Sequence, residues 1–498
     1  MNIGANYIGQ LWNITAVFLF VPFYIKFLGI EAYGLVGFYI TLMGILAFAD
    51  IGLTATLNRE LARLTACNNP VSEMSDLLRT YELIYGGIAL FLASLMWVLA
   101  PGIANHWLQL STFTSGDVTL VIRIMGIAIA LQLPANLYIG GLMGLQKQVL
   151  SNSIQIVWSV LRGGGSVLML WLVSPTILAF IGWQLFSNII YFLLARINIW
   201  RTIGSREIEP RFKKSVIKKT WRFAFGMAGM SFISIALLQL DKLAVSKLLP
   251  LEMLGYYMLA ATVASIPSLL AGPIIKAVFP RFTKLVETGD YESTVTLYHR
   301  TSEFIALAII PTGVVGIAFS GELIFIWTGV VEASRQAGMV ASLLLTGALM
   351  QSMTVVAFHI ALAHGYVRLN LKVGIASIIL LLPMLFLLIP VYGVNGAGIS
   401  WLIMNVCIFI PYMYFLHSRF LKGEFMRWCL WSVGRPLFIA LPMVLLGGWL
   451  VPQADSRFLM FFLIGLIWAV TTSVTAIFTS PSLKFTLKKL FYTTVGAS

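Results

Sequence analysis

The feature that most constrains this chain is a series of apolar runs of about 20 residues, which recurs from one end to the other. A helix of ~20 residues spans the ~30 Å hydrocarbon core of a bilayer and satisfies its own backbone polar groups. Only 10% of the residues are charged, which is too few to cover a soluble protein of 498 residues. The runs predict an all-α, polytopic membrane protein. Outer-membrane barrel strands would instead show short alternating segments.

We expect about fourteen transmembrane helices in this chain. Their ranges are 6–28, 33–57, 80–101, 119–144, 149–172, 177–199, 221–247, 253–278, 301–319, 338–363, 370–390, 395–417, 433–451 and 457–478.

Basic residues concentrate in alternate loops between these spans. The loops that share this bias are 58–79, 145–148, 196–222, 276–300, 364–372, 418–428 and 479–498, and they hold 25 of the 33 Lys and Arg residues. The positive-inside bias places these loops and both termini in the cytoplasm. The same distribution explains the net charge of +14 without nucleic acid as a partner.

An internal duplication is visible at a constant offset of 221 residues. The pattern Lys-x-Leu-x-x-Glu-x-x-Gly occurs at 26–34 and again at 247–255, and Arg-Thr-x-Glu occurs at 79–82 and at 300–303. Each copy holds six helices, so both copies start on the same side of the membrane. We therefore expect two parallel repeats around a central cavity, with a substrate path between them.

These observations predict four parts of the chain. Residues 1–200 form an N-terminal six-helix lobe, and residues 201–220 form a basic cytoplasmic linker. Residues 221–420 form a C-terminal six-helix lobe, and residues 421–498 hold the final helix pair and a cytoplasmic tail.

Ionisable residues within the spans are the best candidates for function, because each charge at the bilayer centre costs ~2.5–3.5 kcal/mol on insertion scales. Arg162 is near the midpoint of its span and precedes three glycines, 163–165, which allow close approach of a ligand or another backbone. An Arg in a cavity can bind phosphate through its planar fork. The alternative is a buried ion pair with Asp241 or Asp50.

Four other charges lie within predicted spans. Arg123 lines the cavity or extends outward to the interface, and Lys242 also reaches toward the outer interface. Asp241 is too short to reach that interface and needs a partner or a proton, which makes it a candidate for ion or proton coupling. Asp50 is a second such candidate, with a structural role as the alternative: it pairs with Arg59 or Arg63, or accepts from backbone at a helix irregularity.

Signatures of catalysis are missing from the sequence. It contains no Walker A motif, no nucleophile elbow and no zinc pattern. We expect no catalytic residue, no metal and no cofactor, and so predict a transporter rather than an enzyme.

Several short motifs resemble those of the polysaccharide transporters, the Wzx-type flippases within the multidrug/oligosaccharidyl-lipid/polysaccharide exporter superfamily. They are Ala-Asp-Ile-Gly-Leu at 49–53, Asn-Arg-Glu-Leu-Ala-Arg at 58–63, Gly-Leu-Gln-Lys at 144–147, Leu-Asp-Lys at 240–242 and Leu-Gly-Tyr-Tyr at 254–257. The resemblance covers about residues 1–420.

The resemblance implies transfer of an undecaprenyl-diphosphate-linked oligosaccharide across the bacterial cytoplasmic membrane by alternating access. It also implies a cationic lumen, which Arg162, Arg123 and Lys242 fit. The lipid-linked oligosaccharide and the phospholipid bilayer are then the partners, with a polysaccharide polymerase and chain-length machinery as further candidates. The repeat unit is O-antigen, capsule or exopolysaccharide.

Two rival functions remain open at this point. A cation-coupled multidrug exporter of the same superfamily should carry mainly acidic charge in its cavity, whereas the mid-span charges here lean basic. A membrane-embedded polysaccharide polymerase or ligase should have a large periplasmic loop, and none is predicted. Lipid II flippases carry Arg and Asp in their first helix, but the first span here has no charge before Lys26.

Overall fold

The computed structural model describes residues 2–50, 52–66, 71–204, 210–449, 451 and 456–479. Every regular element in these ranges is a helix, apart from a single β-bridge between Gln109 and Pro250. Twelve described helical stretches are long and apolar enough to cross a membrane, and a shorter apolar stretch covers Thr15–Leu28. The predicted all-α membrane fold is confirmed, and each predicted span overlaps a helix.

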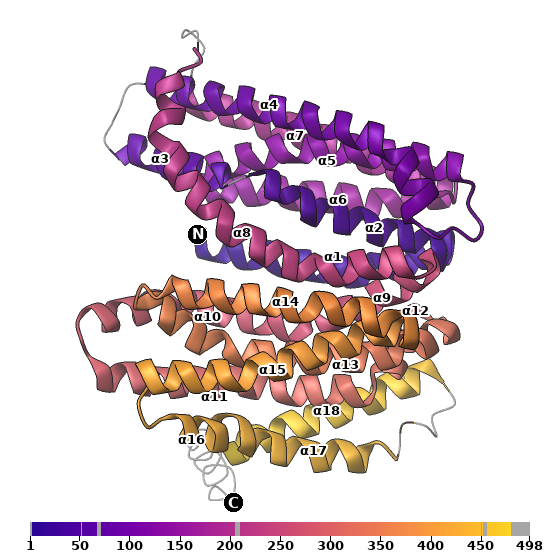
Figure 1. Ribbon diagram of the computed structural model, residues 1–498, viewed down its shortest axis with the longest axis vertical. Coiled ribbons are helices and arrows are strands. Elements are labelled where there is room, and N and C mark those ends of the chain that lie inside the picture. The colour runs from indigo at the N-terminus through magenta and orange to yellow at the C-terminus, as the bar shows by residue number, and fades with distance from the viewer. Residues whose placement is uncertain are drawn as a thin grey trace, which may run out of the picture. The chain divides into compact units, whose positions relative to one another are not determined.

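Two compact units make up the chain, Met1–Gly255 and Tyr256–Ser498. The first contains α1 (Asn2–Leu28), α2 (Ile30–Leu46), the 3-10 helix η1 (Ala47–Asp50), α3 (Leu53–Ala66), α4 (Val71–Gly102), the π-helix η2 (Ile103–Trp107), α5 (Ser115–Gly144), α6 (Gln148–Leu172), α7 (Ile177–Ile203) and α8 (Lys214–Leu248). Helix α5 packs against both α4 and α7 (Figure 1). Tyr81, Tyr85 and Tyr138 are buried in the core between these helices.

Helix α9 (Leu251–Ala264) crosses the boundary between the units. The second unit continues with α10 (Ile266–Glu287), α11 (Tyr291–Ala318), α12 (Ser320–Thr328), α13 (Val331–Ala363), α14 (Val367–Tyr392), α15 (Val394–Phe420), α16 (Phe425–Arg427), the π-helix η3 (Trp428–Gly434), α17 (Arg435–Gly447) and α18 (Arg457–Thr479). Asp290 caps α11 by accepting from Ser293 N at 3.0 Å, and the hydrogen bonds from Ser293 lower the pKa of this carboxyl.

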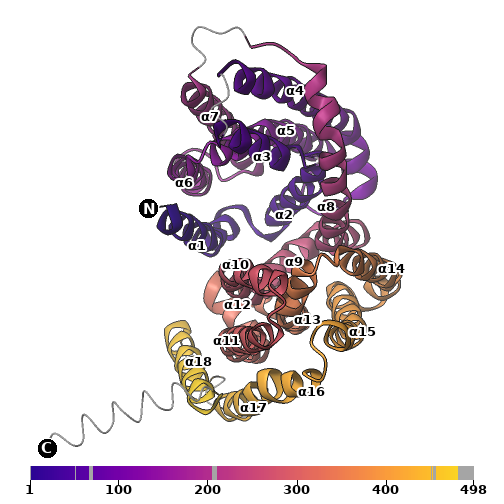
Figure 2. The ribbon, with the colours of Figure 1, turned by 90° about the vertical axis from the view of Figure 1, so that its left-hand side faces the viewer.

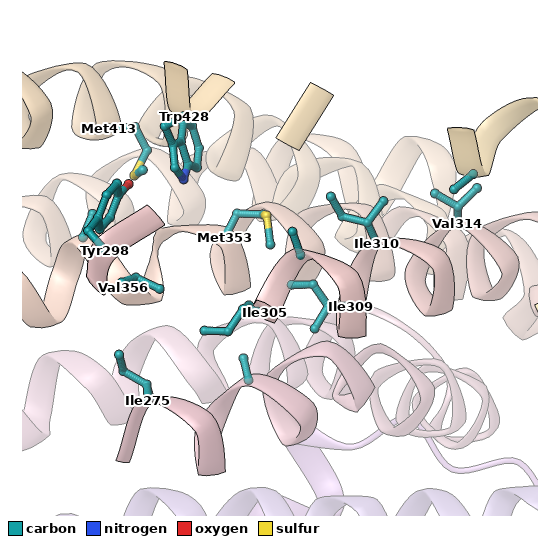
Figure 3. Packing of buried hydrophobic residues seen from close by; sticks show 14 of the residues in the cluster. Ile275, Tyr298, Ile305, Ile309, Ile310, Val314, Met353, Val356, Met413 and Trp428 are labelled. Carbon is teal, nitrogen blue, oxygen red and sulfur yellow. The ribbon is translucent and has the colours of Figure 1, made fainter. Parts of the chain in front are cut away.

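The core of the second unit forms around α11. Helices α10, α13, α17 and α18 all pack on it, and α17 and α18 are neighbours in Figure 2. Figure 3 shows side chains of this core from α10, α11, α13, α15 and η3, namely Ile275, Tyr298, Ile305, Ile309, Ile310, Val314, Met353, Val356, Met413 and Trp428. The final helix pair therefore packs into the same core as the helices before it.

Two predicted spans are interrupted. The span expected over 33–57 ends as η1, and Gly52 at φ +69° separates it from α3. Glycine adopts this left-handed conformation without a Cβ penalty, so the chain can change direction there. The span expected over 253–278 breaks between α9 and α10, where Pro267 occupies the first turn of α10. Proline has no amide hydrogen to continue the preceding helix.

Helix α8 lies in the first compact unit, although the predicted division assigns residues 221–247 to the second lobe. It packs on α2, α3 and α4 (Figure 2). Phe232 meets Phe48 edge to face with ring centres 5.2 Å apart, and the Gln239 side chain fills the space beside Gly44. The compact units thus divide later in the chain than the predicted lobes. The lobes, as copies of a duplication, remain a prediction.

One contact bears on that duplication. A Cβ added to Gly34 would lie 2.2 Å from the carbonyl oxygen of Leu251, and a Cβ added to Gly255 would lie 2.5 Å from that of Ile30. Residues 30 and 251, like 34 and 255, are related by the offset of 221. The contact is therefore reciprocal, and all of these residues belong to the first compact unit. Glycine is needed at both positions because the opposing groups are backbone.

Candidate functional site

Arg162 lies near the middle of α6 and is partly buried. Its Cζ atom is 5.1 Å from the centre of the Trp158 ring, an arrangement that contributes ~0.5–2 kcal/mol. Within the described part of the chain, no carboxylate pairs with Arg162, and no group accepts a hydrogen bond from its guanidinium. The alternative expectation, an ion pair with Asp241 or Asp50, is wrong.

The three glycines after Arg162 admit aromatic side chains from two other helices. A Cβ on Gly163 would lie 2.4 Å from the Phe20 ring of α1, and a Cβ on Gly165 would lie 2.5 Å from the Trp183 ring of α7. Trp183 Nε1 donates to the carbonyl oxygen of Leu161 at 2.9 Å. The groups that approach the glycines within the described residues are aromatic rings rather than the expected backbone, and they lock α6 between α1 and α7; approach of a ligand stays a prediction.

Helices α7 and α1 form hydrogen bonds with α6 close to Arg162. Trp158 Nε1 donates to Asn188 Oδ1 at 3.1 Å, and the Trp158 ring stacks on Tyr191 with centres 4.4 Å apart. Asn188 Nδ2 in turn donates to the carbonyl oxygen of Ala128 at 2.9 Å. Tyr24 OH of α1 donates to the Gly163 carbonyl oxygen at 3.1 Å. The indole beneath Arg162 is therefore held by a hydrogen bond and a ring contact from α7.

Gln184 adds a polar group to the same interface. It is 2% exposed, its Nε2 donates to Ser166 Oγ at 3.0 Å, and its Oε1 has no described hydrogen-bond partner. Sequence reasoning did not single out Gln184 or Asn188. The signal was present, because two amides four residues apart in an apolar span fall on one helix face.

Asp50 is the last residue of η1, and its carboxylate accepts hydrogen bonds from the first turn of α3. Its Oδ1 accepts from Thr54 N at 3.3 Å, and it also accepts from the hydroxyls of Thr54 and Tyr85. Arg59 and Arg63, the partners considered for it, pair instead with Glu60 at 3.2 and 2.9 Å. The expectation that Asp50 accepts from backbone at a helix irregularity is confirmed, whereas the pairing with an arginine is wrong.

Asp241 and Lys242 of α8 pair with each other. Lys242 Nζ lies 3.1 Å from Asp241 Oδ1 and also donates to the Leu238 carbonyl oxygen at 2.6 Å. The two side chains are 6% and 17% exposed. The expectation that Lys242 extends to the outer interface is wrong, because its long stem folds back along the helix to neutralise the buried carboxylate.

Arg123 of α5 contacts α4. Its Cζ lies 4.7 Å from the centre of the Trp97 ring, and its Nε donates to the Trp97 carbonyl oxygen at 3.5 Å. The Trp97 side chain is 47% exposed. The contacts described for Arg123, Arg162 and Lys242 share no residue, so the structure holds each of the three cations on its own partners.

The second unit contains a separate polar cluster. His299 Nε2 lies 2.7 Å from Glu424 Oε2, and Tyr298 OH lies 3.0 Å from His417 Nε2. Arg427 pairs with the same glutamate at 3.6 Å. These contacts join the start of α11 to the end of α15 and to Glu424, which precedes α16. In the described ranges, no group of three His, Cys, Asp or Glu side chains could hold a metal ion.

Comparison with known proteins gives matches in sequence and in fold. The sequence model of a family described as polysaccharide biosynthesis protein matches residues 1–286, more than half of the chain. A Shigella flexneri protein named for O-antigen transport is 23% identical over 311 residues, which are 62% of this chain and 72% of that protein.

Two solved structures share the fold. A lipid II flippase MurJ in an inward closed conformation superposes with a TM-score of 0.69 over 97% of this chain and 99% of its own, at 13% identity. An inward-facing MATE multidrug resistance transporter superposes with a TM-score of 0.64 over 84% of this chain and 96% of its own, at 12% identity. The fold is that of MurJ and MATE transporters, and the chain belongs to the polysaccharide biosynthesis protein family.

Proposed function

We propose that this protein is a flippase. Its substrate is an undecaprenyl-diphosphate-linked repeat unit of an O-antigen, capsule or exopolysaccharide, and it moves this unit from the inner to the outer leaflet of the bacterial cytoplasmic membrane. The family match, a relative named for O-antigen transport and the flippase-like fold support this proposal.

The observation that carries the mechanism is the state of Arg162. A guanidinium within an apolar helix, without a described carboxylate partner, is costly unless it meets an anion. It contacts the Trp158 face and retains its five N–H donors for an incoming oxygen anion. A diphosphate provides several such oxygens in the geometry that an arginine fork fits. We propose that Arg162 binds the diphosphate while the polyprenyl tail stays in the bilayer.

Alternating access then requires a contact that forms and breaks. A cation–π contact can yield to a charged ligand at a cost of ~0.5–2 kcal/mol, less than the 3–5 kcal/mol for breaking a buried ion pair. Arg162 meets that requirement better than Lys242, whose charge is already neutralised by Asp241 at 3.1 Å. We propose secondary contacts with sugar or phosphate for Arg123 and Lys242. The Asp241–Lys242 pair is the proposed coupling site, in preference to Asp50.

The test is export in cells that lack their own flippase and express Arg162→Gln or Arg162→Lys. Surface polysaccharide and accumulated lipid-linked repeat units are measured together, with protein level checked by immunoblot. Loss of export with accumulation of the lipid-linked unit is expected for Gln, with partial retention for Lys. Arg335→Gln is the control, because Arg335 is 78% exposed and pairs only loosely with Glu332 at 3.9 Å. Wild-type export in Arg162→Gln cells would exclude Arg162 from the mechanism.

A cation-coupled multidrug exporter is the alternative with the same fold. Such a protein needs an acidic residue for its cationic substrates, whereas Arg162, which pairs with no described carboxylate, is basic. Drug resistance without restored polysaccharide export in the same cells would favour the exporter and reject the flippase.

A further inference from the structure

A basic pocket lies where the start of α4 meets the end of α7. Its volume is about 420 Å³, and its lining residues are Arg79, Arg196, Ile197, Trp200, Arg201 and Pro210. This volume falls in the range of ~300–1,000 Å³ that is typical of small-molecule sites. All of its lining belongs to the first compact unit, and the lining residues of α7 lie on a different part of that helix from the Arg162 interface.

Counted over the described residues, the pocket carries an excess of positive charge. Glu82 is the carboxylate that contacts the lining arginines, at 2.8 Å from Arg79 Nη1 and 2.6 Å from Arg196 Nε. It also accepts from Tyr138 OH at 2.7 Å, so its oxygens are fully engaged. Arg201 is exposed and has no ion pair with any described carboxylate. Among the residues that the structure describes, three guanidinium charges against one carboxylate leave two positive charges at the pocket.

The neighbouring acid does not reduce this charge. Asp76, one turn before Arg79 on α4, is paired with Lys213 Nζ at 2.5 Å and accepts from Arg211 N at 2.6 Å. Each interaction brings a cationic residue to the carboxylate. The negative charge of Asp76 is therefore neutralised by Lys213 and does not offset the arginines of the pocket.

Trp200 lines the same pocket. Its Nε1 atom is buried and donates to no described acceptor. An unsatisfied buried donor costs ~1–3 kcal/mol, so a ligand acceptor at this position is favourable. Tryptophan and arginine at the end of an apolar helix are also characteristic of the membrane interface, where a lipid headgroup resides.

We propose that this pocket binds the phosphate group of an anionic lipid at the predicted cytoplasmic surface. Guanidinium groups contact the phosphate oxygens, the Trp200 indole donates to one of them, and the acyl or prenyl chains remain in the bilayer. Basic pockets between transmembrane helices on the cytoplasmic side are suited to such headgroups. Two lipids offer this chemistry: a bilayer phospholipid such as phosphatidylglycerol, and a polyprenyl diphosphate awaiting transport.

The experiment measures lipid binding to the full-length protein in detergent by native mass spectrometry. The probes are phosphatidylglycerol, zwitterionic phosphatidylcholine of the same acyl chains, and undecaprenyl diphosphate. Arg201→Gln removes a charge from an exposed position, and Trp200→Phe removes the indole donor but keeps a ring. Each variant should weaken binding of the anionic lipid about tenfold, the effect of one hydrogen bond to a charged group. Arg300→Gln, at the position that duplicates Arg79, should leave binding unchanged.

Each outcome decides the proposal. Weakened binding of phosphatidylglycerol alone assigns the pocket to a structural phospholipid, and weakened binding of undecaprenyl diphosphate alone assigns it to the substrate lipid. Equal binding of both anionic lipids to the wild type and to both variants overturns the proposal, as does equal binding of phosphatidylcholine and phosphatidylglycerol without diphosphate binding. Because the readout is binding, its failure is distinct from a failure of the export test.

Discussion

The packing of α6 against α1 predicts opposite effects for two adjacent substitutions. A Cβ on Gly163 would lie 2.4 Å from two atoms of the Phe20 ring, whereas a Cβ on Gly164 would lie 3.7 Å from the nearest atom of that ring. Carbon atoms attract best at ~3.5–4.0 Å, so only the first position is overpacked.

The magnitudes follow from two opposing terms. Replacing a helical glycine with alanine stabilises by about 1 kcal/mol at either position, and that term cancels in the comparison. Overpacking costs ~1–3 kcal/mol at Gly163 alone. Gly163→Ala should therefore be less stable than Gly164→Ala by ~1–3 kcal/mol in free energy of unfolding.

The assay is reversible unfolding of the purified variants in mixed micelles, followed by helical circular dichroism. Combining Gly163→Ala with Phe20→Leu removes the ring atoms in conflict and should recover part of the loss, which a double-mutant cycle quantifies. Equal stability of Gly163→Ala and Gly164→Ala would refute the inferred contact between α1 and α6.

Three further predictions concern other contacts of the first unit. Lys242→Met should cost ~3–5 kcal/mol in unfolding free energy because it removes the lysine that pairs with a buried carboxylate, and adding Asp241→Leu should recover much of that loss; additive losses would contradict a direct pair. Gly34→Ala should reduce folded yield on size-exclusion chromatography, because its Cβ would lie 2.2 Å from a backbone oxygen. Tyr85→Phe should cost ~1–3 kcal/mol by removing a donor to Asp50, and unchanged unfolding would argue against that hydrogen bond.

Sequence patterns predicted the helices well because the relevant signal is local. An apolar run of sufficient length requires a helix whatever lies beside it, since lipid offers no hydrogen-bond partner. The interruptions at Gly52 and Pro267 are also local, although which glycine takes a positive φ depends on the neighbouring packing. The spans near η1 and α10 were therefore the ones that the structure interrupted.

The partners of the buried charges, in contrast, depend on which helices pack together and are not set by local sequence. Trp158 and Arg162 are four residues apart on α6, so helical geometry alone permits their contact. Asp50 and Tyr85, or Glu82 and Arg196, meet only because α4 packs on its neighbours. Short sequence motifs do not predict these pairs, because many polar residues lie at similar depths in the membrane.

The sequence by itself determined a membrane-spanning helical chain, the residues that place charge within the spans, and a resemblance to polysaccharide transporters. Only the tertiary structure decided that Lys242 is neutralised, that Arg162 lies on an indole without a described carboxylate, and that Arg79, Arg196 and Arg201 surround a pocket. The physical reason is the separation in sequence of the residues that interact. Hydrophobic burial follows a periodic local pattern, whereas ion pairs and pockets are set within a few ångströms by helices that are distant in the chain.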